Sequence, residues 1–210
     1  MAGNTVVHIV DDDESLRRAL DRLFSSVGLE TRSYGSAQDF INAPRLDAPG
    51  CIVLDVRLPG MSGIEFQERL AKLGIRLPVV LMTGHADIPM SVRAMKAGAI
   101  DFLSKPFRDQ DMLDAVTAAV NRDCERRSAD SVAIGLRDRL ATLSPREQQV
   151  MVLVTAGKMN KQVAGDLGIS EITVKIHRGA AMRKMGARTL ADLVRMVESL
   201  RVQGALTDRR

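Results

Sequence analysis

The stretch "TVVHIVDDDESLRRAL", residues 5–20, joins an apolar run, three consecutive aspartates and the start of an amphipathic helix. The apolar run predicts a buried strand. Three carboxylates directly after it repel one another unless a positive partner compensates them. Asp13 or Glu14 can cap the helix that follows. This leaves Asp11 and Asp12 either as solvated loop residues or as ligands of a cation.

Apolar runs alternate with helical patterns from this stretch to about residue 122. The runs predict strands at residues 5–10, 29–34, 51–55, 78–83 and 101–105. The helical patterns cover residues 14–28, 36–43, 62–74, 88–99 and 109–122. The first helix should face the sheet with Leu16, Leu20, Leu23 and Val27. Such alternation predicts an α/β domain, with helices on both faces of a doubly wound five-stranded parallel sheet.

Composition restricts the class of protein. The 210 residues suffice for two small domains, and at 45% hydrophobic and 3% aromatic residues the cores must be aliphatic. No apolar run approaches the roughly 18 residues of a membrane span. The N-terminus lacks a basic region followed by an apolar stretch, so we expect no export signal. Cys51 and Cys124 lie far apart, which suits a reducing compartment. We therefore expect a soluble, cytoplasmic protein without membrane contact.

Charge is divided unequally along the chain. Residues 1–123 carry 14 lysines and arginines against 17 acidic residues, a net charge of −3. Residues 124–210 carry 16 against 9, a net charge of +7. The basic part favours a polyanion such as nucleic acid as partner, although a solvated basic face would give the same count.

Polar side chains stand where four of the predicted strands end. They are Asp11, Asp12, Asp55, Thr83 and Lys105. The carboxyl ends of parallel strands form one ligand-binding edge, so these side chains should converge. Carboxylates suit a hard cation such as Mg²⁺. A lysine and a hydroxyl can stabilise the oxygens of a phosphoryl group, which a carboxylate can accept as nucleophile.

Four motifs, "VDDD", "LDVRLPGMSG", "MTGHAD" and "DFLSKPF", resemble in order and spacing the signatures of response-regulator receiver domains. The resemblance covers about residues 5–122 and implies a flavodoxin-like fold with Asp55 as phosphoacceptor. It implies a Mg²⁺ (or Mn²⁺) site whose ligands are Asp11, Asp12, Asp55 and the main-chain carbonyl of Arg57. Asp13 is not a ligand in this family and keeps the capping role.

The same resemblance assigns the remaining roles. Thr83 would be the switch hydroxyl, Phe102 the switch aromatic residue and Lys105 the lysine that meets the phosphoryl group. Lys105-Pro106 would be a cis peptide. A sensor histidine kinase would be the phosphoryl donor, and phosphorylation would promote a homodimer through the surface of residues 88–104.

The basic part is predicted to be all-helical. Residues 123–141 predict an amphipathic linker helix, with an apolar stripe of Ala129, Val132, Ala133, Leu136 and Leu140. Ser144 and Glu147 form a capping box for the next helix. We therefore expect three parts: a receiver at 1–122, a linker at 123–141 and a helical domain at 142–210.

Residues 160–186 follow the pattern of a helix-turn-helix. A helix at 160–167 ends at Gly168, and Ser170 caps a second helix. Val174, Ala181 and Met185 form the inward stripe of that helix. The residues that could contact DNA are Lys161, Thr173, Lys175, Ile176, Arg178, Gly179, Arg183 and Lys184.

Residues from about 142 to 185 resemble the four-helix DNA-binding domain of the NarL/LuxR group. The whole chain, about residues 5–200, resembles a response regulator of the FixJ type. The resemblance implies a phosphorylation-switched transcription factor that binds double-stranded DNA and works with RNA polymerase. It implies no enzyme beyond Mg²⁺-dependent phosphoryl acceptance and slow self-dephosphorylation. The chain departs from some relatives at Gly179, where they carry a lysine.

Two other functions fit parts of the pattern. One is a phosphorylatable adaptor whose C-terminal helices bind protein. The other is an aspartate-nucleophile phosphatase, which needs a second acid two residues after the nucleophile. Arg57 occupies that position here, which disfavours a phosphatase.

Overall fold

The computed structural model describes residues 5–44, 46–84, 88–202 and 204–206. The end of the MTGHAD motif, residues 85–87, lies outside these ranges. The chain forms two compact units, Met1–Arg127 and Ser128–Arg210, and each is described by itself. No helix in the described ranges is both long and apolar enough to cross a membrane.

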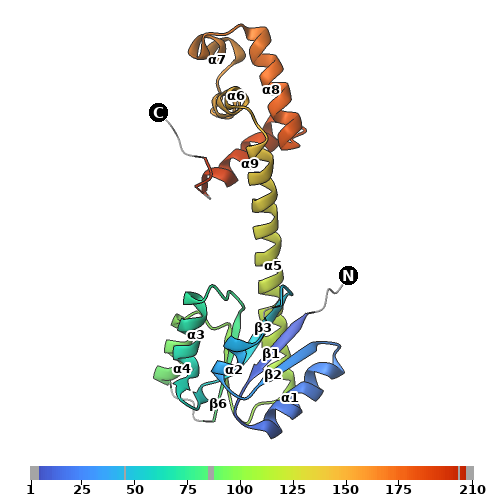
Figure 1. The fold of residues 1–210 in the computed structure, drawn as a ribbon, viewed down its shortest axis with the longest axis vertical. Coiled ribbons are helices and arrows are strands. Elements are labelled where there is room, and N and C mark those ends of the chain that lie inside the picture. Colours follow the sequence, from blue (N-terminus) through green and yellow to red (C-terminus); the bar gives the residue numbers. More distant parts are fainter. Residues whose placement is uncertain (1–4, 45, 85–87, 203, 207–210) are drawn as a thin grey trace. The chain divides into compact units, whose positions relative to one another are not determined.

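Unit 1 contains the predicted parallel sheet, in the strand order β2-β1-β3-β6-β7 (Figure 1). Its strands are β1 (Val6–Val10), β2 (Glu30–Tyr34), β3 (Gly50–Asp55), β6 (Val79–Thr83) and β7 (Asp101–Ser104). All four neighbouring pairs are parallel. Each predicted strand is therefore confirmed, and the chain order reverses between β1 and β3, where such sheets bind ligands.

Helices cover both faces of the sheet. They are α1 (Glu14–Ser26), α2 (Ala37–Asn42), α3 (Gly63–Lys72), α4 (Ile88–Lys96) and α5 (Asp109–Ala141). In β3, Cys51 and Val53 pack with α1 and α5, whereas Ile52 and Leu54 pack with α2, α3 and α4. Alternate residues of one strand thus serve two cores, which is why the strands are apolar throughout.

Helix α1 starts as expected and ends differently. The Asp13 carboxylate accepts the backbone N–H groups of Ser15 and Leu16 at 2.8 and 3.2 Å, so the predicted cap is confirmed. The expectation that Val27 faces the sheet is wrong, because its side chain is 52% exposed. Val27 is the C-cap and has left the helical conformation. Phe24, three residues earlier, is fully buried and packs in the core between α1 and the sheet.

Two short antiparallel strands, β4 (Arg57–Leu58) and β5 (Met61–Ser62), follow Asp55. They enclose a turn at Pro59-Gly60, and Gly60 has a φ of +81°, a conformation that favours glycine. Ser62 then caps α3 in a capping box with Glu65.

Helix α5 is one continuous helix that covers both helical segments expected from the sequence, at 109–122 and 123–141. Asp123 is fully buried and accepts the Gly50 N–H at 3.2 Å and Arg127 Nε at 2.7 Å. The bond to Gly50 ties the helix to the first residue of β3. The first compact unit, Met1–Arg127, includes these contacts.

The apolar stripe expected at 129–140 is buried only at its end. Val132 is 62% exposed, whereas Leu136 and Leu140 are buried in the core of unit 2. The stripe keeps its regular helical spacing, but only the last turns of α5 have a core to join.

Unit 2 is all-helical, as predicted. Beyond the end of α5 it contains α6 (Pro145–Thr155), α7 (Asn160–Leu167), α8 (Glu171–Met185) and α9 (Leu190–Val202). The Ser144–Glu147 capping box is present. Gly168 ends α7 with a φ of +63°, and the Ser170 hydroxyl caps α8. Val174, Ala181 and Met185 are buried, so the predicted inward stripe is confirmed.

Candidate metal centre and nucleic-acid interface

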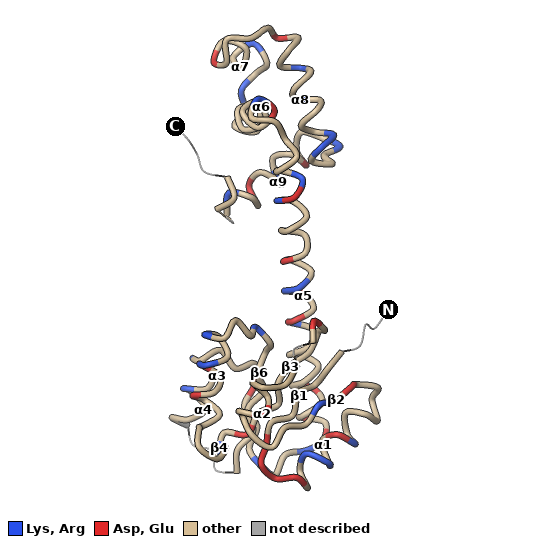
Figure 2. The backbone as a smooth tube through the Cα atoms, viewed as in Figure 1, with Lys and Arg blue, Asp and Glu red and all other residues tan. Residues whose placement is uncertain are grey.

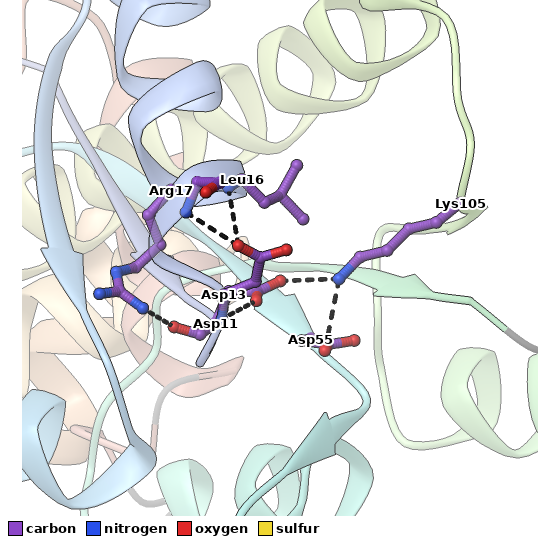
Figure 3. A network of polar contacts seen from close by, with 7 residues as sticks. Asp11, Asp13, Leu16, Arg17, Asp55 and Lys105 are labelled. Atoms are coloured by element: carbon purple, nitrogen blue, oxygen red, sulfur yellow. Dashed lines mark hydrogen bonds and ion pairs between the residues drawn. The ribbon is translucent and has the colours of Figure 1, made fainter.

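Asp11, Asp55 and Lys105 converge at one edge of the sheet, as expected from its parallel topology (Figure 3). Asp11 and Asp12 follow β1, and Asp55 is the last residue of β3. One carboxylate oxygen from each of these three residues lies within 4.8 Å of the other two. Asp11 and Asp55 are buried, and Asp12 is exposed. Two of the three carboxylates of the cluster are thus buried, and the third is exposed to solvent.

Lys105 reaches into this cluster from the segment after β7. Its Nζ lies 2.7 Å from Asp11 Oδ2 and 3.3 Å from Asp55 Oδ2. Its backbone N–H donates to the carbonyl of Thr83 at 2.7 Å, and Thr83 is itself fully buried at the end of β6. The Lys105-Pro106 peptide is cis, as the resemblance implies. A hydrogen bond between main-chain groups therefore joins Lys105 to Thr83 at one edge of the pocket.

The electrostatics of Asp55 favour a bound cation. Burial raises the pKa of the Asp55 carboxyl above its ordinary value, the Lys105 ammonium opposes this shift, and the Asp11 carboxylate adds to it. Asp55 Oδ1 is buried without a hydrogen-bond partner. Three carboxylates against one ammonium leave an excess of negative charge. An oxygen donor set of this kind fits Mg²⁺ or Mn²⁺.

The loop after Asp55 depends on a glycine whose importance the sequence analysis missed. A Cβ atom at Gly63 would lie 2.3 Å from the carbonyl oxygen of Asp55 and 2.9 Å from Val56 Cα. The Gly63 N–H donates to the Val56 carbonyl at 2.8 Å. Only glycine allows this close approach, which holds the end of β3 against the start of α3. Arg57, the residue whose carbonyl is a candidate metal ligand, begins β4 within this loop.

The surface proposed for dimerisation includes α4 and β7. Phe102 on β7 is half-buried and packs against the core beneath α2, α3 and α4. On α4, Ala94 is buried, whereas Val92 and Met95 are 46% and 48% exposed. Segment 88–104 therefore combines a half-buried aromatic residue with apolar side chains that are open to solvent.

Helix α8 presents the second candidate site. Lys175 and Arg183 are exposed, Ile176 is 63% exposed, and Arg178 and Gly179 are half-buried. Figure 2 shows basic residues on both α7 and α8, and Lys161 on α7 is exposed. The Thr173 hydroxyl lies 2.8 Å from that of Ser170. Ile172, which the sequence analysis did not single out, is 71% exposed in the first turn of α8.

Lys184 differs from the other candidates for DNA contact. Its Nζ lies 2.6 Å from Glu147 Oε2 and donates to the Thr142 carbonyl at 3.1 Å. This ammonium, followed by the Ser144 backbone N–H, holds the pKa of the Glu147 carboxyl below its ordinary value. Arg139 at the end of α5 donates to the Met185 carbonyl at 3.0 Å. Both contacts fasten the C-terminal end of α8 to the rest of unit 2.

Two family models match the chain. Residues 7–117 match the response regulator receiver domain, and residues 141–197 match the bacterial regulatory proteins of the luxR family. Nodulation protein W of Bradyrhizobium diazoefficiens is 56% identical over 97% of this chain and 90% of its own length. The transcriptional regulatory protein FixJ of Azorhizobium caulinodans is 44% identical over 90% of each chain.

Solved structures agree with these matches. The response regulator StyR has a TM-score of 0.85 at 48% identity, covering 93% of this chain and 99% of that one. Full-length FixJ from B. japonicum has a TM-score of 0.57 at 38% identity, covering 96% and 98%. The fold and the two-part organisation agree in each comparison. The chain therefore belongs to the FixJ-type transcriptional response regulators of two-component systems, in which a receiver domain is joined to a LuxR-type DNA-binding domain.

Proposed function

We propose that Asp55 is the phosphoacceptor of this response regulator and that a sensor histidine kinase is its donor. The observation that carries this proposal is the convergence of Asp11, Asp12 and Asp55 around an ammonium contributed by Lys105. A divalent cation, Mg²⁺ or Mn²⁺, would neutralise the charge of the incoming phosphoryl oxygens when bound. Its ligands would be the three carboxylates and the main-chain carbonyl of Arg57.

The chain's own groups then have separate roles. An Asp55 carboxylate oxygen attacks phosphorus as the bond to the donor histidine breaks. Lys105 pairs with a phosphoryl oxygen in place of its present carboxylate partners, and the Thr83 hydroxyl donates to another. Because the Lys105 N–H and the Thr83 carbonyl are bonded, movement of either strand end displaces the other. Phe102 follows inward and changes the 88–104 surface, which pairs two copies of the chain.

Dimerisation presents two copies of α8 to a two-fold DNA site. We propose that Lys175, Ile176, Arg178 and Gly179 face the major groove, and that Lys161, Thr173 and Arg183 contact the backbone or flanking bases. The protein is thus a cytoplasmic switch that acts with RNA polymerase, and it turns over no substrate beyond its own phosphoryl group. The active and inactive conformations are two populations of one equilibrium that phosphorylation shifts, so some active form should exist without phosphate.

Intact mass after incubation with a small-molecule phosphodonor tests the phosphoacceptor. We expect a gain of one phosphoryl group in the wild type with Mg²⁺, and no gain in Asp55→Asn or in the presence of EDTA. The same samples are then titrated with a duplex selected by the wild-type protein from a random pool, and phosphorylation should tighten binding. Equal gain of mass in Asp55→Asn would assign the phosphoryl group to another residue.

A further inference from the structure

Arg17, one turn into α1, folds back onto the loop that carries the acidic residues (Figure 3). Its Nη1 donates to the main-chain carbonyl oxygen of Asp11 at 2.5 Å. A methyl group at Gly35 would lie 3.9 Å from the same nitrogen. The guanidinium therefore lies between the loop after β1 and the loop after β2. None of the motifs that indicate the phosphoacceptor pocket includes Arg17.

The carbonyl that Arg17 holds belongs to the peptide group joining Asp11 to Asp12. The Asp11 side chain is already fixed, because its Oδ1 accepts the Asp13 N–H at 2.8 Å and its Oδ2 accepts Lys105 Nζ. The Asp12 side chain is exposed. Its direction therefore depends on the orientation of the backbone before it, and the Arg17 hydrogen bond sets that orientation.

We propose that Arg17 is a positioning residue for the divalent cation: it holds the Asp11–Asp12 peptide so that the Asp12 carboxylate faces the other two. This inference rests on the proposed metal site. Groups that orient metal ligands by hydrogen bonds commonly change metal affinity by about 10–100-fold when they are removed. Arg17 acts on the main chain of the ligands and touches neither the cation nor the phosphoryl group.

Charge alone predicts the opposite sign. A guanidinium close to a cation site repels the cation, so its removal should tighten binding if repulsion were its only effect. A positioning role predicts weaker binding after the same substitution. Arg18, the next residue, supplies a matched control, because it is exposed and pairs with Glu14 at 2.5 Å.

The test uses Mn²⁺ as the probe and the full chain at neutral pH. The electron paramagnetic resonance signal of free Mn²⁺ gives the dissociation constant without any phosphoryl transfer. We expect Arg17→Gln to raise this constant about tenfold or more, and Arg17→Lys, which keeps a donor and the charge, to recover most of the affinity. Arg18→Gln should stay within about twofold of the wild type, because screened surface charges act weakly.

Thermal unfolding in EDTA identifies variants that are unfolded, and Arg17→Lys keeps the test available if Arg17→Gln fails to fold. Unchanged or tighter binding in Arg17→Gln, with an unfolding temperature like the wild type, would overturn the positioning role. Equal losses in Arg17→Gln and Arg18→Gln would also overturn it. If Asp12→Asn bound Mn²⁺ as the wild type does, the metal site itself would be wrong and the role of Arg17 with it.

Discussion

Lys105 Nζ lies 2.7 Å from Asp11 Oδ2, although the two residues are 94 positions apart in the chain. The same nitrogen lies 3.3 Å from Asp55 Oδ2. The lysine thus pairs with the same carboxylates that a cation would bind, and phosphoryl oxygens would compete with those carboxylates for the lysine. This ammonium answers in part the question raised by three consecutive aspartates, because it compensates the one that is fully buried.

Replacing Lys105 should separate metal binding from phosphoryl transfer. Lys105→Gln removes a competing positive charge, so we expect Mg²⁺ to bind about fivefold more tightly. Phosphorylation of Asp55 by a small-molecule donor should nevertheless slow by on the order of 100-fold, because the donor to the phosphoryl oxygen is lost. Metal titration and time-resolved intact mass measure the two effects. Lys96→Gln on α4 is the control, and a similar change in that variant would contradict a specific role for Lys105.

Asp12 and Asp13 should differ sharply despite being neighbours. Asp13 caps α1 through its carboxylate, and asparagine caps a helix about as well as aspartate. We therefore expect Asp13→Asn to keep Mg²⁺ binding and phosphorylation. Asp12→Asn removes one of three anionic ligands and should weaken Mg²⁺ binding by about tenfold or more. If both variants lost Mg²⁺ affinity equally in a metal titration, the local negative charge would matter and the ligand position of Asp12 would not.

Removing a carboxylate should change the unfolding temperature in opposite directions at the two ends of β3. Because burial raises the pKa of Asp55, the folded state binds that proton more tightly than the unfolded state. Stability then falls as pH rises through this interval and stays lower above it. Asp55→Asn should therefore raise the unfolding temperature in EDTA at pH 7.5.

Asp123 on α5, which contacts the other end of β3, is the contrasting case. It is fully buried and bonded to the Gly50 N–H and to Arg127. Asp123→Asn should lower the unfolding temperature, because it removes the buried carboxylate that pairs with the partly buried guanidinium groups of Arg126 and Arg127. Differential scanning calorimetry of both variants makes the comparison. A lower unfolding temperature in Asp55→Asn would mean that its pairing with Lys105 outweighs the cost of burial.

His8 should make unit 1 sensitive to mild acid. It is the one polar side chain within β1, and its Nδ1 lies 3.1 Å from the Tyr34 hydroxyl. Burial, with a contribution from the charge of Arg32, lowers the pKa of His8 from 6.5 to about 4. The unfolded state therefore takes up a proton between these values and the folded state does not.

The free energy of unfolding should consequently fall by about 2 kcal/mol between pH 7 and pH 5 through His8 alone. Urea unfolding at the two pH values measures the change, and His8→Val is the comparison, because it removes the titrating group from an otherwise apolar strand. As pH falls, the wild type should lose this free energy of unfolding and the His8→Val variant should not. Parallel pH profiles for the two proteins would contradict the assignment to His8.

Lys175 and Lys184 should give different results on DNA. Lys175 is exposed on α8, whereas Lys184 is bonded to Glu147 and to the Thr142 carbonyl. On a duplex selected by the wild-type protein, Lys175→Ala should weaken binding and reduce the slope of log K against log salt, because it removes an exposed cation from the face proposed to enter the major groove. Lys184→Ala should leave the slope nearly unchanged and lower the unfolding temperature of unit 2. A reduced slope in Lys184→Ala would assign it to the DNA contact surface.

The sequence by itself determined the sheet, the helix order and the residues that meet at the strand ends. It could do so because strand and helix periods are local, and because parallel topology brings the ends of β1, β3 and β6 to one edge. Its error about burial was also local, because Val27 continues the apolar spacing but follows the end of α1.

Only the tertiary structure decided the contacts made by long side chains and close backbones. It placed the Arg17 guanidinium on the Asp11 carbonyl, engaged Lys184 within unit 2 and left no room for a side chain at Gly63. It also joined α5 into one helix and tied Asp123 to Gly50. Arginine and lysine side chains are long and flexible, so their partners depend on which segments pack nearby. That information belongs to the assembled fold and not to any local stretch of the chain.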